Sequence, residues 1–444
     1  MSAVTAVESA THGAASATRL ILAASLGNAL EFYEILVYGY FAVTVSKVFF
    51  PATNQAVSLL VTLGTVGISY LSRPIGALFL GDYGDRRGRK RALTLSILLM
   101  TLGTGLMTIM PSYAWLATLI PGYPSLGLLS PILVIAARLL QGFSVGGEFA
   151  SSTTFLVEHR PDRAGFFASW QWTSQGLAAL IATGFGVLLS GTLSAEDLQA
   201  WGWRTPFAFG LLIGPVGYYI RSNMAETPEF SAATAPRAPM RELVATQWDR
   251  LLLVIGAVII STSSQYMLLY MPTYAIHELH LPQYLSYAAA ASAAALQVLL
   301  VPLVGIWVDR MGQSRIMIAA AALFFLTAYP AFALLARQGS LSILIVVVCW
   351  MALLKSCYSG ALPSFMAKIF PAATRVSGLS LSYNVAVTIF GGFAPFFAQS
   401  LVDLTGSNLA PSYYIMATAL LSLVSLLILQ GRIDPPAILK RELR

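Results

Sequence analysis

Acidic side chains occur within a long apolar stretch near the start of this 444-residue chain. Glu31 and Glu34 lie three positions apart, and Asn28 and Tyr38 fall on the same stripe of a helix. A charge at the centre of a bilayer costs on the order of 2.5 to 3.5 kcal/mol, so this stripe is expected to face a partner or a water-filled path. Buried carboxylates of this kind can take up and release protons.

Two cations lie in comparable positions further along the chain. At a rise of about 1.5 Å per residue, Arg138 lies above the two carboxylates, near enough for its side chain to reach toward Glu34. Lys355 lies near the middle of its own apolar segment, and no acidic residue of the second half of the chain lies at matching depth. An unpaired ammonium in this position indicates a negatively charged partner that arrives from outside.

Each of these charged residues also has a structural interpretation, and the sequence leaves both open. Arg138 and Glu34 would form a permanent ion pair between two helices, whereas Lys355 would extend to water or pair across a cavity with Glu31 or Glu34. Arg73-Pro74 is more typical of a packing and kink element than of a ligand.

Two strings resemble catalytic motifs but lie in the wrong context. Gly142–Gly146 matches the nucleophile-elbow pattern, which works only at a strand-to-helix turn, whereas here the string lies inside an apolar helix. Its glycines are expected to let neighbouring helices approach closely. His277–His280 has the wrong spacing for two zinc ligands, and Cys349 and Cys357 fit neither a disulfide nor a metal site. The sequence therefore predicts neither an enzyme nor a metal centre.

The elements that must position these residues are membrane-spanning helices. Hydrophobic residues make up 57% of the chain and charged residues 10%, where soluble proteins have roughly 25% charged residues. Twelve apolar segments are long enough to cross a bilayer as helices. They are 20–45, 56–80, 91–111, 131–157, 165–190, 205–222, 250–274, 284–308, 315–337, 342–368, 375–401 and 412–431. We predict an all-α membrane protein.

An internal repeat divides the chain into two halves. The loop Gly81–Arg91 returns in weaker form as Gly305–Arg315, each time between two apolar segments. A duplicated bundle of this kind is typical of transporters. We expect a disordered tail at 1–18, six-helix halves at 19–222 and 250–431, a linker at 223–249 and a tail at 432–444.

Basic residues set the expected orientation. Most of the 26 Lys and Arg residues fall in the tails and in the loops on one side, which the positive-inside rule makes cytoplasmic. Both termini are then cytoplasmic. These loops account for the net charge of +7, so the charge does not indicate nucleic-acid binding.

The repeated loop resembles the loop between helices 2 and 3 of the major facilitator superfamily and its duplicate between helices 8 and 9. Five further blocks resemble the metabolite:proton symporter branch of that superfamily: Gly27–Glu34, Arg73–Gly76, Arg138–Glu148, Trp201–Phe207 and Phe390–Gly392. The resemblance implies a major facilitator fold of two pseudo-symmetric six-helix halves, in a multi-pass protein of the bacterial inner membrane.

The resemblance and the buried charges predict a proton-coupled symporter that imports a small organic anion by alternating access. Citrate or a related tri- or dicarboxylate is favoured, because the segment Leu129–Phe230 and helices 10 and 11 resemble bacterial citrate and tricarballylate carriers most, and because a net-neutral solute would not need both Arg138 and Lys355. The alternative is a proton-coupled carrier of a zwitterionic osmolyte such as proline or betaine. We expect the proton to be the coupling ion, no cofactor, the lipid bilayer as the surroundings, and function as a monomer.

The expected site residues fall into three groups. Substrate binding is assigned to Arg138, Lys355, Gln141, Gln265, Tyr266, Tyr358 and Asn384. Proton coupling is assigned to Glu34 and Glu31. Gating is assigned to Asp85, Arg86, Arg163, Asp309 and Arg375, and the resemblance implies that Asp85 pairs with Arg163 and Asp309 with Arg375.

Overall fold

The computed structural model of the chain describes residues 25, 28–87, 89–146, 148–212, 214–216, 239–371 and 374–433. Every regular element in these ranges is helical. The predicted tail 1–18, residues 434–444 of the predicted tail 432–444, and residues 223–238 of the predicted linker lie outside the described residues.

The first half contains several helices that bend or break. Its first helix, Asn28–Tyr40, turns by 68° into α2, and α5 turns by 67° into α6. The elements are α2 (Ala42–Phe49), α3 (Gln55–Leu71), α4 (Arg73–Arg87), α5 (Arg89–Ile109), α6 (Tyr113–Leu119), η1 (Pro124–Leu128), α7 (Leu129–Ser144), α8 (Glu148–His159), η2 (Pro161–Arg163), α9 (Ala164–Thr192), α10 (Ala195–Asp197), η3 (Leu198–Gly202) and α11 (Arg204–Gly210).

The second half is built from longer helices. A short helix, α13, precedes it in the predicted linker, and the eleventh predicted span is formed by α18, a π-helical turn and α19. The elements are α13 (Pro239–Thr246), α14 (Trp248–His277), α15 (Gln283–Met311), α16 (Gln313–Gln338), α17 (Leu341–Ile369), α18 (Arg375–Ala386), η5 (Val387–Gly392), α19 (Ala394–Thr405) and α20 (Ala410–Ile433).

These helices account for the predicted membrane spans. Among the described residues, nine helices are long and apolar enough to cross a membrane, and the two bent pairs raise the number to eleven. The remaining predicted span, 205–222, begins with α11 and then extends beyond the described residues. Large apolar side chains such as Leu78, Leu299 and Val346 are exposed, as expected for a surface that faces lipid.

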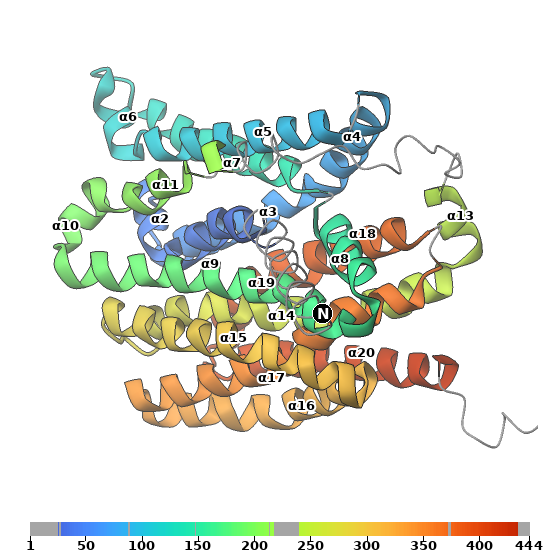
Figure 1. Cartoon of the computed structure of the whole chain (residues 1–444). Coiled ribbons are helices and arrows are strands. Elements are labelled where there is room, and N and C mark those ends of the chain that lie inside the picture. Colours follow the sequence, from blue (N-terminus) through green and yellow to red (C-terminus); the bar gives the residue numbers. More distant parts are fainter. Residues whose placement is uncertain are drawn as a thin grey trace, which may run out of the picture.

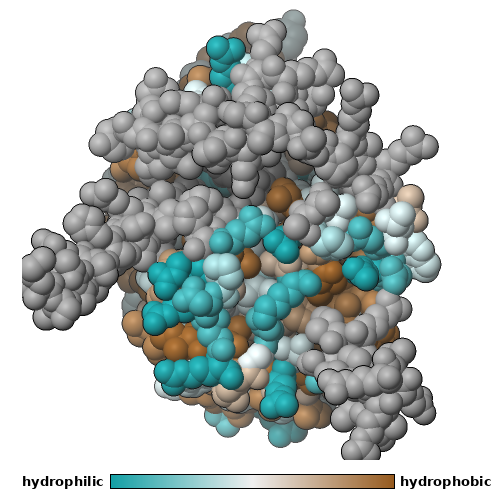
Figure 2. Space-filling model, turned by 45° about the vertical axis from the view of Figure 1, so that its right-hand side comes forward, coloured by the Kyte–Doolittle hydropathy of each residue, from teal (hydrophilic) through white to brown (hydrophobic). Residues whose placement is uncertain are grey.

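The two halves lie side by side, each with its helices roughly parallel (Figure 1). Most of the blue-to-green half, α2 to α11, occupies the upper part of the view and most of the yellow-to-red half, α14 to α20, the lower part, while α18 lies beside α8 at mid-height. Helices α9 and α15 run along the boundary between them. Figure 2 brings forward the end of the molecule at the right of Figure 1, where hydrophilic residues gather among hydrophobic ones.

Two glycines fix the position of α7 against α3 and α4. A Cβ atom on Gly142 would lie 1.7 Å from the carbonyl oxygen of Ser69, and one on Gly146 would lie 2.3 Å from that of Arg73. The expectation that these glycines let helices approach closely is therefore confirmed. The close approach fixes the register between Arg138 on α7 and the α3–α4 junction.

Candidate functional site

A hydrogen-bond network joins Arg138 to Glu34 in the interior of the first half. Gln141 Nε2 donates to Glu34 Oε2 at 3.3 Å and to Thr104 Oγ1 at 3.2 Å. Arg138 Nη1 donates to Gln141 Oε1 at 2.8 Å. Both charged side chains are fully buried, and Gln141 links them instead of the direct ion pair that the sequence left open.

The second oxygen of Glu34 is the less constrained one. Glu34 Oε1 is buried and has no hydrogen-bond partner. A Cβ atom on Gly210 would lie 1.5 Å from it, so only a glycine of α11 leaves room for this oxygen. Glu31, one turn earlier on the same helix, is also buried. Glu34 thus has an oxygen at which a proton can reside without displacing an existing hydrogen bond.

The guanidinium of Arg138 contacts residues of its own half of the protein, the first half. Its Nη2 lies 3.4 Å from Ser69 Oγ, and its Cζ lies 4.4 Å from the ring centroid of Tyr38. The Tyr38 hydroxyl is in turn hydrogen bonded to Thr65. Only Nε of the guanidinium lacks a hydrogen-bond partner. Each terminal nitrogen carries two N–H groups and makes one hydrogen bond, so Arg138 keeps donors for a substrate although its position is already fixed by Gln141 and Ser69.

Lys355 lies at the boundary between the halves. It is fully buried on α17, and its Nζ donates to Gln297 Oε1 of α15 at 2.7 Å. The same Nζ lies 4.7 Å from the ring centroid of Trp172, which belongs to α9 of the other half. Within the part of the chain that is described, no carboxylate lies within 4.0 Å of it. The partners of this ammonium are thus neutral.

The remaining predicted substrate residues divide between the boundary and the second half. The Tyr266 hydroxyl contacts that of Tyr70 across the boundary, and Asn384 Nδ2 donates to the Gly146 carbonyl at 3.0 Å. Gln265 is buried, and its Oε1 has no hydrogen-bond partner. Tyr358, by contrast, donates to the Ala257 carbonyl of its own half at 2.5 Å. The structure therefore places Tyr358 in the packing of the second half, away from the other candidates.

At the predicted cytoplasmic end, the gating residues have other partners than expected. Asp309 accepts hydrogen bonds from the backbone N–H groups of Gly165, at 2.7 Å, and Phe166, at 3.0 Å. Arg375 pairs with Glu158 at 2.6 Å. The expected pair of Asp309 with Arg375 is thus wrong, because the unpaired N–H groups and the positive dipole at the start of α9 attract the carboxylate.

The structure describes the side chain of only one member of the other predicted gating pair, Asp85 with Arg163. Arg163 is exposed and immediately precedes α9. The side chains of Asp85 and Arg86 lie outside the described residues, so their expected contact with Arg163 stays a prediction.

The halves also meet at the opposite end. The Tyr287 hydroxyl of α15 donates to the Tyr40 carbonyl at 3.0 Å, and its ring stacks on Phe41 at 5.6 Å. Gln283 Nε2 donates to Thr44 Oγ1 at 3.3 Å. The described residues of the two halves thus contact each other at both ends of the molecule.

Known proteins match this chain over most of its length. A family model described as "Sugar (and other) transporter" matches residues 20–236. A citrate-proton symporter of Klebsiella pneumoniae is 35% identical over 410 residues, which cover 91% of this chain and 90% of the relative. A proline/betaine transporter of Salmonella typhimurium is 32% identical, over 92% of this chain and 82% of the relative.

The arrangement of helices matches as well. A solved structure of the proton:xylose symporter of the major facilitator superfamily, bound to 6-bromo-6-deoxy-D-glucose, has a TM-score of 0.73 at 16% identity. The match covers 95% of this chain and 96% of that one. This chain belongs to the major facilitator superfamily. Within it, the chain falls in the metabolite:proton symporter branch, as the motifs predicted, and it is a multi-pass membrane transporter of the bacterial type.

Three residues in this major facilitator fold have contacts that the sequence alone did not reveal. Gln297 was missed, although a lone amide in the alanine-rich segment Ala288–Leu300 is the same signal that identified Gln141. Trp172 is not among the predicted site residues, and Arg73 was interpreted as a packing and kink element. In the structure Trp172 contacts Lys355 across the boundary, and Arg73 is a buried cation beside Tyr70.

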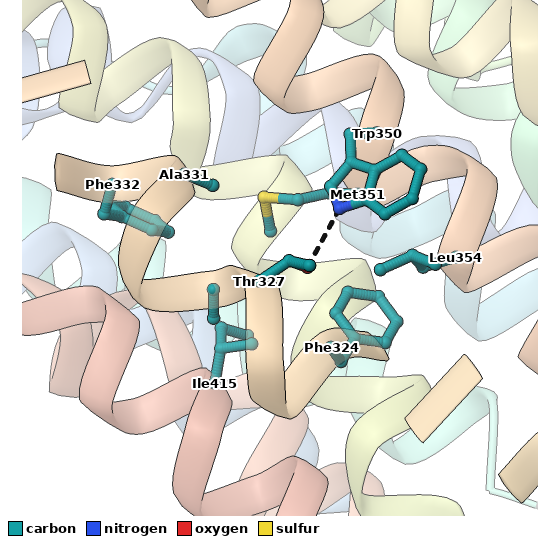
Figure 3. Close-up of a pocket in the computed structure, with 9 residues that line it drawn as sticks. Phe324, Thr327, Ala331, Phe332, Trp350, Met351, Leu354 and Ile415 are labelled. Atoms are coloured by element: carbon teal, nitrogen blue, oxygen red, sulfur yellow. Dashed lines mark hydrogen bonds between the residues drawn. The ribbon is translucent and has the colours of Figure 1, made fainter. Parts of the chain in front are cut away.

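Two hollows of the protein lie away from the charged residues. The cavity in Figure 3 is enclosed by α16, α17 and α20, where Trp350 Nε1 donates to Thr327 Oγ1 at 2.9 Å. Its volume of about 10 Å³ accommodates at most one water molecule. An apolar groove is lined by residues of α5 together with Leu211, Gly214 and Pro215. Neither is lined by a charged residue, so neither is a candidate site for an ionic substrate.

Proposed function

We propose that this transporter is a proton-coupled symporter that imports a small organic anion, citrate or a related di- or tricarboxylate, by alternating access. The observation that carries the proposal is Lys355, a fully buried ammonium between the two halves with a neutral amide and an indole ring as its partners. We place the protein in a bacterial inner membrane, as a monomer with both termini cytoplasmic.

The energetics of Lys355 favour an anionic ligand. A charged hydrogen bond contributes about 1.5 to 3 kcal/mol and a cation–π contact about 0.5 to 2 kcal/mol. Burying an ammonium costs several kcal/mol even after relaxation, so these neutral contacts offset only part of the cost. A substrate carboxylate would supply the missing counter-charge. Arg138 and Arg73, which are also buried, add positive charge from the first half.

In this proposal Gln141 connects substrate binding at Arg138 to the protonation of Glu34. This one amide accepts from Arg138 and donates to Glu34, so a substrate that draws Arg138 away changes the hydrogen bonding of the carboxyl group. Glu34, with its free oxygen, is the favoured proton carrier, and Glu31 on the same helix is the second candidate. Binding and proton transfer are then linked within one continuous set of side chains.

The second candidate is a proton-coupled carrier of a zwitterionic osmolyte. It is supported by the proline/betaine transporters among the relatives, at 32% identity, and by the position of Trp172, whose ring already lies beside a cation. An aromatic face of this kind can bind a quaternary ammonium group. A net-neutral ligand, however, would leave Lys355 without a counter-charge.

A counterflow panel tests the proposal. Purified protein in liposomes preloaded with unlabelled citrate, a dicarboxylate, proline or betaine is diluted into the labelled form of the same solute. We expect transient accumulation of labelled citrate or another di- or tricarboxylate and none of proline or betaine. Counterflow of proline or betaine alone would instead establish the zwitterion carrier.

A further inference from the structure

Arg73 is a buried arginine at the boundary with an unused carboxylate-binding edge. Its side chain is 2% exposed, and its Cζ lies 4.0 Å above the ring centroid of Tyr70. Two of its nitrogens, Nε and Nη2, are buried and have no hydrogen-bond partner. Native proteins rarely leave such donors unsatisfied, because each costs free energy comparable to a lost hydrogen bond.

The identity of the two free atoms is informative. Nε and Nη2 form one edge of the planar guanidinium, and their N–H bonds are nearly parallel, which suits the two oxygens of a carboxylate. This chain uses the same edge at its surface, where Arg160 donates from Nε to Asp162 Oδ1 at 3.0 Å and from Nη2 to Oδ2 at 3.1 Å. Arg138 differs, because its Nη2 already donates to Ser69.

Arg73 also lies next to residues through which the two halves contact each other. The Tyr70 hydroxyl beneath it contacts Tyr266 of α14, and the Tyr70 carbonyl accepts from Thr388 at 3.2 Å. On its other side, the backbone of Arg73 packs against Gly146, whose carbonyl accepts from Asn384. Its backbone is thus held in place, while one edge of its guanidinium has no partner.

We propose that the Nε and Nη2 edge of Arg73 binds a carboxylate of the transported substrate. The inference rests on the proposed function only in that the solute carries a carboxylate. A di- or tricarboxylate would place one carboxylate at Arg73 and would have a further carboxylate for another cation such as Lys355. A zwitterion would place its single carboxylate at Arg73.

The test compares Arg73→Lys, which keeps the positive charge and loses the planar edge, with Arg73→Gln, which loses both. Arg160→Lys is the matched control, because Arg160 uses the same edge for a surface aspartate. The probe is whichever of citrate, a dicarboxylate, proline or betaine the parent exchanges in counterflow. We expect the KM of both Arg73 variants to rise tenfold or more, with the unliganded melting temperature of the Lys variant within a few degrees of the parent.

A comparison of substrate analogues in the parent and in the Arg73 variant identifies the substrate group that Arg73 recognises. If the parent carries citrate, it should prefer citrate over the citrate monoamides, and Arg73→Lys should abolish that preference for one monoamide. With betaine as probe, the corresponding analogue is betaine amide. Unchanged KM values and an unchanged preference in the Arg73 variants would overturn the inference, whichever solute is carried. A parent that exchanges none of the four solutes would overturn both the inference and the proposed function.

A measurement on the parent protein covers the case in which the variants fail to fold. Phenylglyoxal labels arginines that become accessible as the transporter alternates, and mass spectrometry resolves the site. Saturating substrate should slow labelling of Arg73 at least tenfold and leave labelling of Arg160 unchanged. Equal labelling of Arg73 with and without a solute that the parent transports would overturn the inference.

Discussion

Gln297→Glu tests the neutral environment of Lys355 most sharply. The substitution keeps the shape of the side chain and places a carboxylate oxygen where Gln297 Oε1 now accepts from Nζ at 2.7 Å. It therefore provides the buried ammonium with an internal counter-ion. If Lys355 is kept for an anionic substrate, this internal carboxylate should compete with that substrate for the same charge.

The magnitude follows from the geometry. At 2.7 Å and an effective dielectric constant of 20, Coulomb's law gives an attraction of roughly 6 kcal/mol, most of which is offset by the several kcal/mol needed to bury the new carboxylate. The folded protein should therefore be about as stable as the parent. The substrate loses its interaction with a desolvated cation, worth about 2 to 5 kcal/mol, so the KM should rise at least roughly thirtyfold.

The assay is counterflow together with the melting temperature of the unliganded protein. Gln313→Glu is the matched control, since Gln313 Oε1 accepts from the exposed Lys368 Nζ at 3.2 Å, and its KM should be unchanged. A folded Gln297→Glu protein that transports its carboxylate with the KM of the parent would refute the reasoning, because Lys355 would then not face the substrate.

Three further changes test other parts of the site. Glu34→Gln keeps the shape of the side chain, but the glutamine cannot bind or release a proton. Substrate exchange should therefore persist while uphill accumulation of substrate fails. Accumulation at the parental level would exclude Glu34 as the proton carrier. Gly142→Ala should lower the melting temperature and abolish transport, because its Cβ would lie 1.7 Å from a backbone oxygen, whereas Gly191→Ala, with open space around it, should be tolerated. Asp309→Ala removes the carboxylate that caps α9, an interaction worth about 0.5 to 2 kcal/mol. The distance between spin labels at positions 163 and 310 should therefore increase. An unchanged distance would exclude Asp309 from gating.

The fold and the buried charges were predictable because both follow from the cost of polar groups in lipid. Twelve apolar segments and a repeated loop are sufficient to predict two six-helix halves. The same cost identified Glu34, Arg138 and Lys355 as residues that must face the interior, and all three are fully buried. The packing role of the glycines in Gly142–Gly146 was also predictable, because a nucleophile elbow requires a strand-to-helix turn and this segment lies in an apolar helix.

The partners of these residues could not be predicted, because depth along a helix does not specify its rotation or its neighbour. Gln141 is one turn from Arg138, yet only the packing of α7 against the first helix places its amide between Arg138 and Glu34. Asp309 was expected to pair with another side chain, whereas backbone N–H groups of the other half bind it. Arg73 was classified by the proline that follows it, although its side chain extends to the boundary.

The central claim, that a carboxylate and protons move together, is tested most directly by the pH inside proteoliposomes. Vesicles that contain the protein and a trapped pH dye are suspended in choline medium without Na⁺ and without an imposed gradient, and the carboxylate identified by counterflow is added outside. The account predicts an acidification of the lumen that depends on the substrate, is abolished by a protonophore and is absent in the Glu34→Gln protein. Substrate uptake without any change of internal pH, or uptake that occurs only when Na⁺ is supplied, would contradict it.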